Sequence, residues 1–256
     1  MTSAAATPQD VPVHVYGGPT TLIEYGGLRF VTDPTFDAPG SYPNGGGPEL
    51  VKTAPTAITP AELGHVDAVL LSHDQHADNL DRAGRAFLAD IPLTLTTTSA
   101  ADRLGGDTRG LAPWESVELT RPGGGTVTVT AAPALHGPVG SEPVVGQVIG
   151  FVLTGDRLPT VYVSGDNASL DVVREIADRV GAVDTAVLFA GAVRTLFFDG
   201  ALLTLDGTQA AEAATILGAR RVVPAHVDSW AHFTEGRDEF VAAFAAADLT
   251  DRLQLS

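Results

Sequence analysis

The sequence predicts an α/β fold in which two β-sheets pack face to face and helices cover their outer surfaces. Each half of the chain begins with short apolar or alternating segments typical of antiparallel strands, and continues with strand–helix alternation. Ligand-type side chains directly follow several of the apolar segments, and strands of this kind deliver them to one edge of a sheet. Two stacked sheets with one site along their common edge account for these observations.

The first half opens with three short strands joined by glycine turns at Gly17-Gly18 and Gly26-Gly27. These strands are Val11–Tyr16, Thr20–Tyr25 and Leu28–Thr32. The third ends at Asp33-Pro34, where the proline favours extended backbone at Asp33, and a turn role and a supporting role at a site are equally open. The Gly- and Pro-rich segment from Phe36 to Thr59, which contains the only lysine, Lys52, is expected to be a loop packed beside the site.

Strands and helices then alternate. One helical turn at Pro60–Leu63 precedes a strand at Val66–Leu71, and apolar residues at helical spacing predict a helix over Leu80–Leu88. A strand at Leu93–Thr98 and a short helix at Ser99–Leu104 complete this half.

The second half repeats the plan without an internal sequence repeat. Its predicted strands are Ser116–Leu119, Thr126–Ala132, Gly146–Leu153, Thr160–Val163, Thr185–Phe189 and Arg221–Pro224. Its predicted helices are Ser169–Val180, Gln209–Leu217 after the cap Asp206, and Glu235–Ala246.

Composition narrows the functional classes. The formal charge of −16 over 256 residues argues against nucleic acid or an anionic membrane as the main partner and favours a small-molecule substrate. The chain has no cysteine, which excludes disulfides, thiolate metal sites and cysteine nucleophiles. We expect residues 1–10 to be a disordered N-terminus and residues 11–256 to form a single domain. With no signal peptide or membrane span recognised, a cytoplasmic location is the default, and oligomeric state leaves no mark in the sequence.

The most informative stretch follows the strand at Val66–Leu71, where an apolar run changes abruptly into histidines and carboxylates. Its candidate metal ligands are His73, Asp74, His76, Asp78 and Asn79. Asp78 or Asn79 could instead cap the following helix. Capping needs only one such residue and leaves both histidines unexplained, so metal coordination is the favoured interpretation.

Three more strand ends carry ligand-type residues, namely His136, Asp166 and His226. A lone histidine at such a place is more often structural than a ligand. Four strand ends that all carry donors favour a shared site. Nitrogen and oxygen donors without sulfur suit Zn²⁺, Mn²⁺ or Fe²⁺ and do not distinguish among them.

In order along the chain, these motifs resemble those of the metallo-β-lactamase superfamily. They are Asp33-Pro34, the stretch 73–79, His136, Ser164-Gly165-Asp166 and Pro224-Ala225-His226. Within the superfamily, the sequence is most similar to the branch that contains ascorbate-6-phosphate lactonase-like and N-acylphosphatidylethanolamine phospholipase D-like proteins. The segments that match this branch best are Thr20–Tyr25, Leu71-Ser72-His73 and Asn79-Leu80-Asp81. The resemblance implies a four-layer αβ/βα sandwich of two mixed sheets, with one or two metal ions, usually zinc, that activate water for hydrolysis.

The sequence departs from the family at its ligand motif, His-x-His-x-Asp-His. When the motif is aligned backwards from Asp78, Asp74 occupies the position of the first histidine. When it is aligned forwards from the strand, His73 occupies that position and one residue is inserted before His76. Either can be the first ligand, and His73 is slightly favoured. The last histidine of the motif is Asn79 here, a weak zinc ligand, so a second site with Asp78, Asp166 and His226 is expected to be weakened. A single metal, or a harder metal that favours oxygen donors, is the alternative.

The resemblance implies a metal-dependent hydrolase acting on a small ester, lactone or amide. His73, His76 and His136 are expected to form the first metal site, and Asp78 to orient the water or accept its proton. Candidate substrate-binding residues are Arg194, Phe197 and Phe198. The alternatives are a phosphodiesterase, or a catalytically degenerate binding protein that retains the fold, which the asparagine at 79 motivates.

Overall fold

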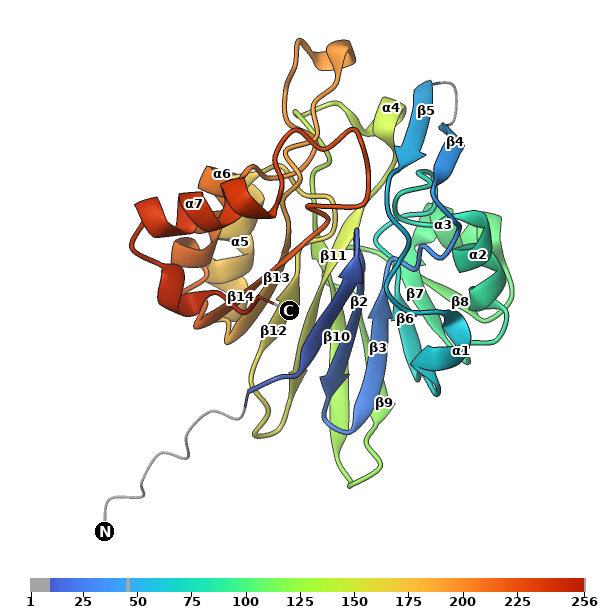
Figure 1. The fold of residues 1–256 in the computed structure, drawn as a ribbon. Helices are drawn as coiled ribbons and strands as arrows, with labels where there is room; N and C mark the ends of the chain where they lie inside the picture. Colours follow the sequence, from blue (N-terminus) through green and yellow to red (C-terminus); the bar gives the residue numbers. More distant parts are fainter. Residues whose placement is uncertain (1–9, 45–46, 256) are drawn as a thin grey trace.

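The computed structural model describes residues 10–44 and 47–255. Two six-stranded sheets face each other, with helices on both outer sides (Figure 1). The strand order is β1-β2-β3-β6-β7-β8 in the first sheet and β14-β13-β12-β11-β10-β9 in the second. Both sheets mix parallel and antiparallel neighbours, so the predicted four-layer α/β sandwich is confirmed. Apart from Asp10, the predicted disordered N-terminus lies outside the described residues.

The strands agree closely with those predicted from hydrophobic pattern. In the first sheet they are β1 (Val13–Gly17), β2 (Thr20–Tyr25), β3 (Leu28–Thr32), β6 (Ala68–Leu70), β7 (Thr94–Thr97) and β8 (Thr108–Leu111). In the second sheet they are β9 (Ser116–Thr120), β10 (Thr126–Pro133), β11 (Ile149–Gly155), β12 (Val161–Val163), β13 (Thr185–Phe189) and β14 (Arg221–Ala225). Of these, β8 was not predicted.

The helices form the outer layers. They are α1 (Pro60–Leu63), α2 (Arg82–Leu88), α3 (Thr98–Leu104), α4 (Glu142–Val145), α5 (Leu170–Val180), α6 (Gly207–Ile216) and α7 (Arg237–Ala246), with 3₁₀ turns at Leu196–Phe198 and Thr250–Arg252. The helices α1, α2 and α3 lie on the side of the first sheet, and α5, α6 and α7 cover the second (Figure 1). Among the described residues, no helix is long and apolar enough to cross a membrane.

Strand β13 shows why the hydrophobic pattern was informative. Val187 and Phe189 pack into the core between the two sheets, whereas Ala186 and Leu188 pack against the outer helices. Successive side chains of a strand point to opposite faces, so a strand covered on both faces must be apolar throughout. Because both sheets contribute to the central core, we propose that residues 11–256 form one domain.

The segment 36–59 is not the loop that was predicted. It contains two antiparallel strands, β4 (Gly40–Asn44) and β5 (Gly47–Lys52), which form a sheet of their own. The prediction was wrong because a short two-stranded edge tolerates glycine and proline, which a central strand does not. Lys52 is buried in β5, with Nζ 3.0 Å from the Thr35 carbonyl oxygen and 3.4 Å from the carboxylate of Asp81.

Strand direction brings the candidate ligands to one end of the sandwich. In the second sheet β12, β13 and β14 are parallel, and β10 runs in the same direction because it is separated from β12 by one antiparallel strand. In the first sheet β3, β6, β7 and β8 are parallel. The segments after β6, β10, β12 and β14 therefore meet where the two sheets open to the same edge.

Gly84 of α2 packs directly against the chain at Pro34, and a β-carbon at residue 84 would lie 1.8 Å from the Pro34 carbonyl oxygen. Helix propensity alone favours alanine there by about 1 kcal/mol. No side-chain rotation can relieve an overlap with the backbone, so the packing clash outweighs the helix propensity and the substitution is expected to be destabilising. We expect Gly84→Ala to lower the free energy of unfolding in urea by about 3 kcal/mol.

The matched control is Gly123→Ala, where a β-carbon would meet nothing within 4 Å. Its stability should stay within about 0.5 kcal/mol of wild type. Equal stability of the two variants would contradict this account of the packing.

Candidate metal centre

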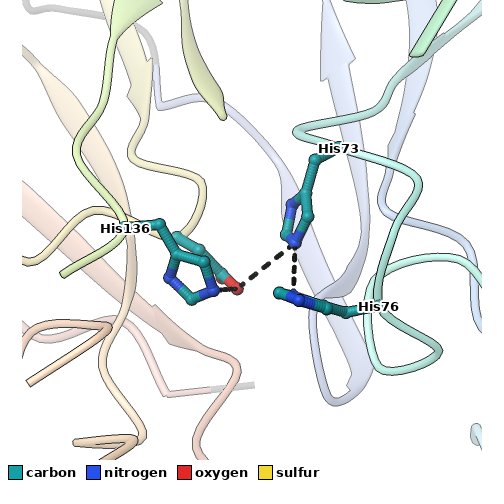
Figure 2. Close-up of side chains that lie close together, drawn as sticks. His73, His76 and His136 are labelled. Carbon is teal, nitrogen blue, oxygen red and sulfur yellow. Dashed lines mark hydrogen bonds and ion pairs between the residues drawn. The ribbon is translucent and has the colours of Figure 1, made fainter. Parts of the chain in front are cut away.

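Three segments from both sheets bring His73, His76, His136 and Asp166 together. His73 and His76 follow β6, His136 follows β10, and Asp166 follows β12. One ligand-type atom of each residue lies within 4.8 Å of those of the other three. Figure 2 shows the three histidine rings converging on a common point. The sequence thus places four donors at a single position on the open edge of the sandwich.

The spacing of the donor atoms suits a metal ion. His73 Nε2 is 2.9 Å from His76 Nδ1, and Asp166 Oδ2 is 3.8 Å from His136 Nε2 and 4.0 Å from His73 Nε2. Zinc bonds of about 2.0–2.1 Å separate neighbouring tetrahedral ligand atoms by roughly 3.3–3.4 Å. The observed separations bracket that value, and the cluster is able to bind a metal.

Outer hydrogen bonds orient two of the rings. His136 donates from Nδ1 to the Leu203 carbonyl oxygen at 2.7 Å, which leaves the lone pair on Nε2. His73 Nδ1 lies 2.9 Å from Ser72 Oγ, whose hydroxyl donates to Asp33 Oδ2 at 2.8 Å. Because the Ser72 hydroxyl donates to Asp33, Ser72 Oγ accepts a hydrogen bond from Nδ1 of His73. His73 therefore also presents the lone pair of Nε2 to the cluster.

Asp33 serves this network rather than an ordinary turn. Its Oδ1 accepts a second bond, from the Ser72 backbone nitrogen at 2.6 Å, and its backbone φ is 31°. The extended backbone predicted before Pro34 is therefore wrong, because the Ser72 bonds fix the carboxylate and hold the residue in the left-handed region. Burial raises the pKa of Asp33 to about 7, against the lowering effect of the Ser72 bonds.

The protonation states suit metal binding, which needs neutral histidines and ionised carboxylates. Burial, reinforced by neighbouring histidines, lowers the pKa of His76 to about 4 and that of His73 well below its ordinary value. Burial opposes ionisation of Asp166, but the charge of His226 and its contact with the carboxylate outweigh it and lower the pKa of the carboxyl. At neutral pH the two histidines keep their lone pairs and the carboxylate keeps its charge.

A second group of donors adjoins the first. Asp78 Oδ2 is 3.2 Å from His226 Nε2 and 3.0 Å from His232 Nε2. The other ring nitrogen of His226 lies 3.1 Å from Asp166 Oδ1, so Asp166 belongs to both groups. Burial acts to lower the pKa of His226, but Asp166 and Asp78 outweigh it and raise the pKa to about 10.

His232 is the functional candidate that the sequence interpretation missed. It lies in the segment Trp230-Ala231-His232-Phe233, between β14 and α7, and not at a strand end. A second histidine shortly after the strand-end His226 was the available signal. Its use at the site depends on how the loop folds back, which spacing does not reveal.

The structure does not bring Asp74 to the cluster. Its carboxylate pairs with Arg103 and Arg85 instead. Of the two alternatives for the first ligand position, His73 is therefore the residue at the cluster. Asn79 is buried, and its amide nitrogen donates to Asp33 Oδ2 at 3.4 Å. Neither Asp78 nor Asn79 caps α2, because Asp81 accepts the bond from the Gly84 nitrogen.

A cavity of about 750 Å³ opens onto the donors. Its polar floor includes His76, Asp78, His136, Asp166 and His232, and its apolar wall includes Val144, Val145, Val193, Leu203 and Phe197. Arg194 also lines the cavity and donates to the Gly200 carbonyl oxygen. Phe197 is exposed beside it, whereas Phe198 packs behind the wall against the cluster of Val145, Val193 and Leu203.

Comparison with known proteins agrees with this geometry. Residues 28–227 match the family described as the Beta-lactamase superfamily domain. The chain is 26% identical over 239 residues to an N-acyl-phosphatidylethanolamine-hydrolyzing phospholipase D of Caenorhabditis elegans, covering 88% of this chain and 65% of that longer protein. It is 26% identical to a UPF0173 metal-dependent hydrolase of Pyrobaculum aerophilum, with 90% of each chain covered.

The fold also matches a solved structure, that of an isothiocyanate hydrolase from Delia radicum gut bacteria. The TM-score is 0.78 over 95% of each chain, at 19% sequence identity. The resemblance inferred from the sequence motifs is therefore confirmed. The chain belongs to the metallo-β-lactamase superfamily and is a metal-dependent hydrolase of that superfamily.

Proposed function

We propose that the protein hydrolyses a small ester, lactone or amide with a metal ion, most simply zinc, held by His73, His76, His136 and Asp166. The observation that carries the proposal is the convergence of these four donors, three of which (His76, His136 and Asp166) line a cavity large enough for a small molecule. When bound, the metal would lower the pKa of a coordinated water and polarise the scissile carbonyl group.

Asp78 is proposed to orient the attacking water. Burial opposes its ionisation, but His232 and His226 hold the pKa of Asp78 well below its usual range, so it is a charged acceptor at neutral pH. Both histidines contact Oδ2, and Oδ1 has no hydrogen-bond partner in the described part of the chain. Oδ1 is buried and unpaired, and we propose it as the oxygen that would accept a hydrogen bond from the attacking water.

The cavity wall supports an acyl substrate with an apolar part. Val144, Val193 and Leu203 offer hydrocarbon surface beside the donors. Arg194 and Phe197 are proposed to contact the substrate at the rim, while Phe198 supports the wall from behind.

Phosphodiester hydrolysis is the second candidate, favoured by three arginines that line the cavity, Arg85, Arg103 and Arg194. Arg85 and Arg103 are both paired with Asp74, however, which removes much of the positive charge that a phosphate needs. We therefore rank a carbonyl substrate first. Both classes can be assayed in one panel of chromogenic esters, lactones and phosphodiesters.

Replacing a ligand should remove both metal and activity. We expect His76→Ala and His136→Ala each to retain only a small fraction of the wild-type zinc by elemental analysis. Hydrolysis of the best substrate in the panel should fall by roughly a hundredfold or more, because removing a supporting group alone costs 10–100-fold.

His14→Ala is the matched control, since His14 is exposed on β1, away from the cluster. It should keep wild-type metal content and rate. Full metal content in both ligand variants would refute the site, and metal-loaded wild type without chelator-sensitive hydrolysis of any panel member would favour the degenerate binding protein.

A substitution at Ser72 tests whether the hydrogen bonds from His73 through Ser72 to Asp33 orient the His73 ring. Ser72→Ala removes the oxygen that links His73 Nδ1 to Asp33, while the backbone bond to Asp33 remains. We expect zinc affinity, measured by chelator competition, to fall by about 10–100-fold. Ser116→Ala, at an exposed position of β9, should leave affinity unchanged. An unchanged affinity in Ser72→Ala would show that the link does not orient the ligand.

A further inference from the structure

We infer that His232 is a ligand of a second metal ion and takes the place that the family motif gives to residue 79. The other ligands of this ion are Asp78, Asp166 and His226. The inference rests on the proposed metal-dependent function, and extends it by supplying the histidine whose absence from the motif suggested a weakened second site.

The first argument is geometry. The imidazole Nε2 atoms of His226 and His232 lie 3.2 Å and 3.0 Å from the same carboxylate oxygen, Asp78 Oδ2. These separations are near those of ligand atoms that share one zinc ion, roughly 3.3–3.4 Å. Nitrogens of two histidines thus face one carboxylate oxygen, and these three side chains form the proposed second donor group.

Asp166 connects the two groups. Its Oδ2 faces His73 and His136 of the first group, at 4.0 Å and 3.8 Å, whereas its Oδ1 lies 3.1 Å from Nδ1 of His226. That last pair is in ion-pair range, yet neither atom has a partner of hydrogen-bond geometry in residues 10–44 and 47–255. Buried charges are paired or coordinate metals, so Asp166, with one oxygen facing each group, would be available to a cation at either of them.

The loop that carries His232 is anchored on two sides. On one side, Thr53 donates to the Ser229 carbonyl and Ala231 donates to the Val51 carbonyl, which fastens the loop to β5. On the other, the backbone nitrogen of Thr234 donates to the Gly191 carbonyl after β13. His232 therefore enters the site from a fixed backbone and not from a free end.

Side-chain packing fixes the same loop. Trp230 is buried in a cluster with Tyr42 and Leu50 of the β4–β5 hairpin. The Phe233 ring lies 4.6 Å from the centroids of both the His226 and His232 rings, edge-on to His226. One aromatic ring thus contacts both histidines and holds their Nε2 atoms toward Asp78.

The amide nitrogen of Asn79 is engaged elsewhere, while its Oδ1 is buried without a hydrogen-bond partner among the described residues. Its amide nitrogen donates to Asp33 Oδ2, the same oxygen that accepts the Ser72 hydroxyl. The residue therefore belongs to the network that supports His73. In this proposal, residue 79, which occupies the position of the motif's last histidine, supports His73. Residue 232 takes over the role of metal ligand.

The test counts metal ions. Wild type and variants are equilibrated with Zn²⁺, dialysed and measured by elemental analysis, and the affinity of each ion is resolved by chelator competition. We expect two zinc ions per wild-type chain and one in His232→Ala and His232→Gln. The glutamine can still donate a hydrogen bond to Asp78 but is a weak ligand, so it separates ligation from hydrogen bonding. Asn79→Ala should retain the second ion, with affinity lowered mainly at the first.

Substitution of Co²⁺ for Zn²⁺ gives a second readout, since visible absorption of the second equivalent should change in His232→Gln and stay unchanged in the His14→Ala control. Two zinc ions in His232→Gln, or loss of the second ion in Asn79→Ala but not in His232→Ala, would overturn the inference. Wild type with one zinc that depends on His76 would overturn it while leaving the proposed function intact. Wild type without any zinc would overturn both.

Discussion

Two buried carboxylates, Asp78 and Asp166, impose the condition that the rest of the site satisfies. An ionised carboxylate without a cationic partner costs several kcal/mol when it leaves water. The protein itself supplies one cationic partner. Asp78 and Asp166 overcome the effect of burial and raise the pKa of His226 to about 10, which favours a proton on the ring between them. A metal ion supplies the same positive charge and competes with that proton for the imidazole lone pair. Charge balance at the site therefore requires a positive charge beside the two carboxylates, either this proton or a metal ion, before any substrate is considered.

The backbone around these groups is held in conformations that other contacts must stabilise. His226 has a φ of 56°, in the left-handed region that is unfavourable for a residue with a β-carbon. Its nitrogen donates to the Gly18 carbonyl at 2.7 Å, and the Gly18 nitrogen in turn donates to Asp228. The glycine turn between β1 and β2 thus supports a histidine from the other end of the chain.

Sequence reasoning succeeded where local pattern determines structure. Thr185–Phe189 was predicted with its observed bounds because a strand buried on both faces has an uninterrupted apolar run. Sequence reasoning favoured His73 over Asp74 only slightly, since one inserted residue changes which side chain faces the site. Only the pairing of Asp74 with Arg103 and Arg85 reveals where Asp74 points. His232 was missed for a related reason. Its position depends on Trp230 packing against Tyr42, a contact between distant parts of the chain that no local pattern encodes.

That long-range contact also links the metal centre to the substrate cavity. Leu50 of the β4–β5 hairpin lines the cavity and packs in the same cluster as Trp230, two residues before His232 in the chain. The ligand motif of the family, like His73 and His76 in this chain, lies on the segment after one strand. Here the proposed ligand, His232, comes from a loop that packs on the β4–β5 hairpin, and this hairpin also lines the cavity. If His232 binds the proposed second metal, changes in the hairpin that alter substrate fit would also shift His232, and substrate selectivity and second-metal affinity would be physically coupled.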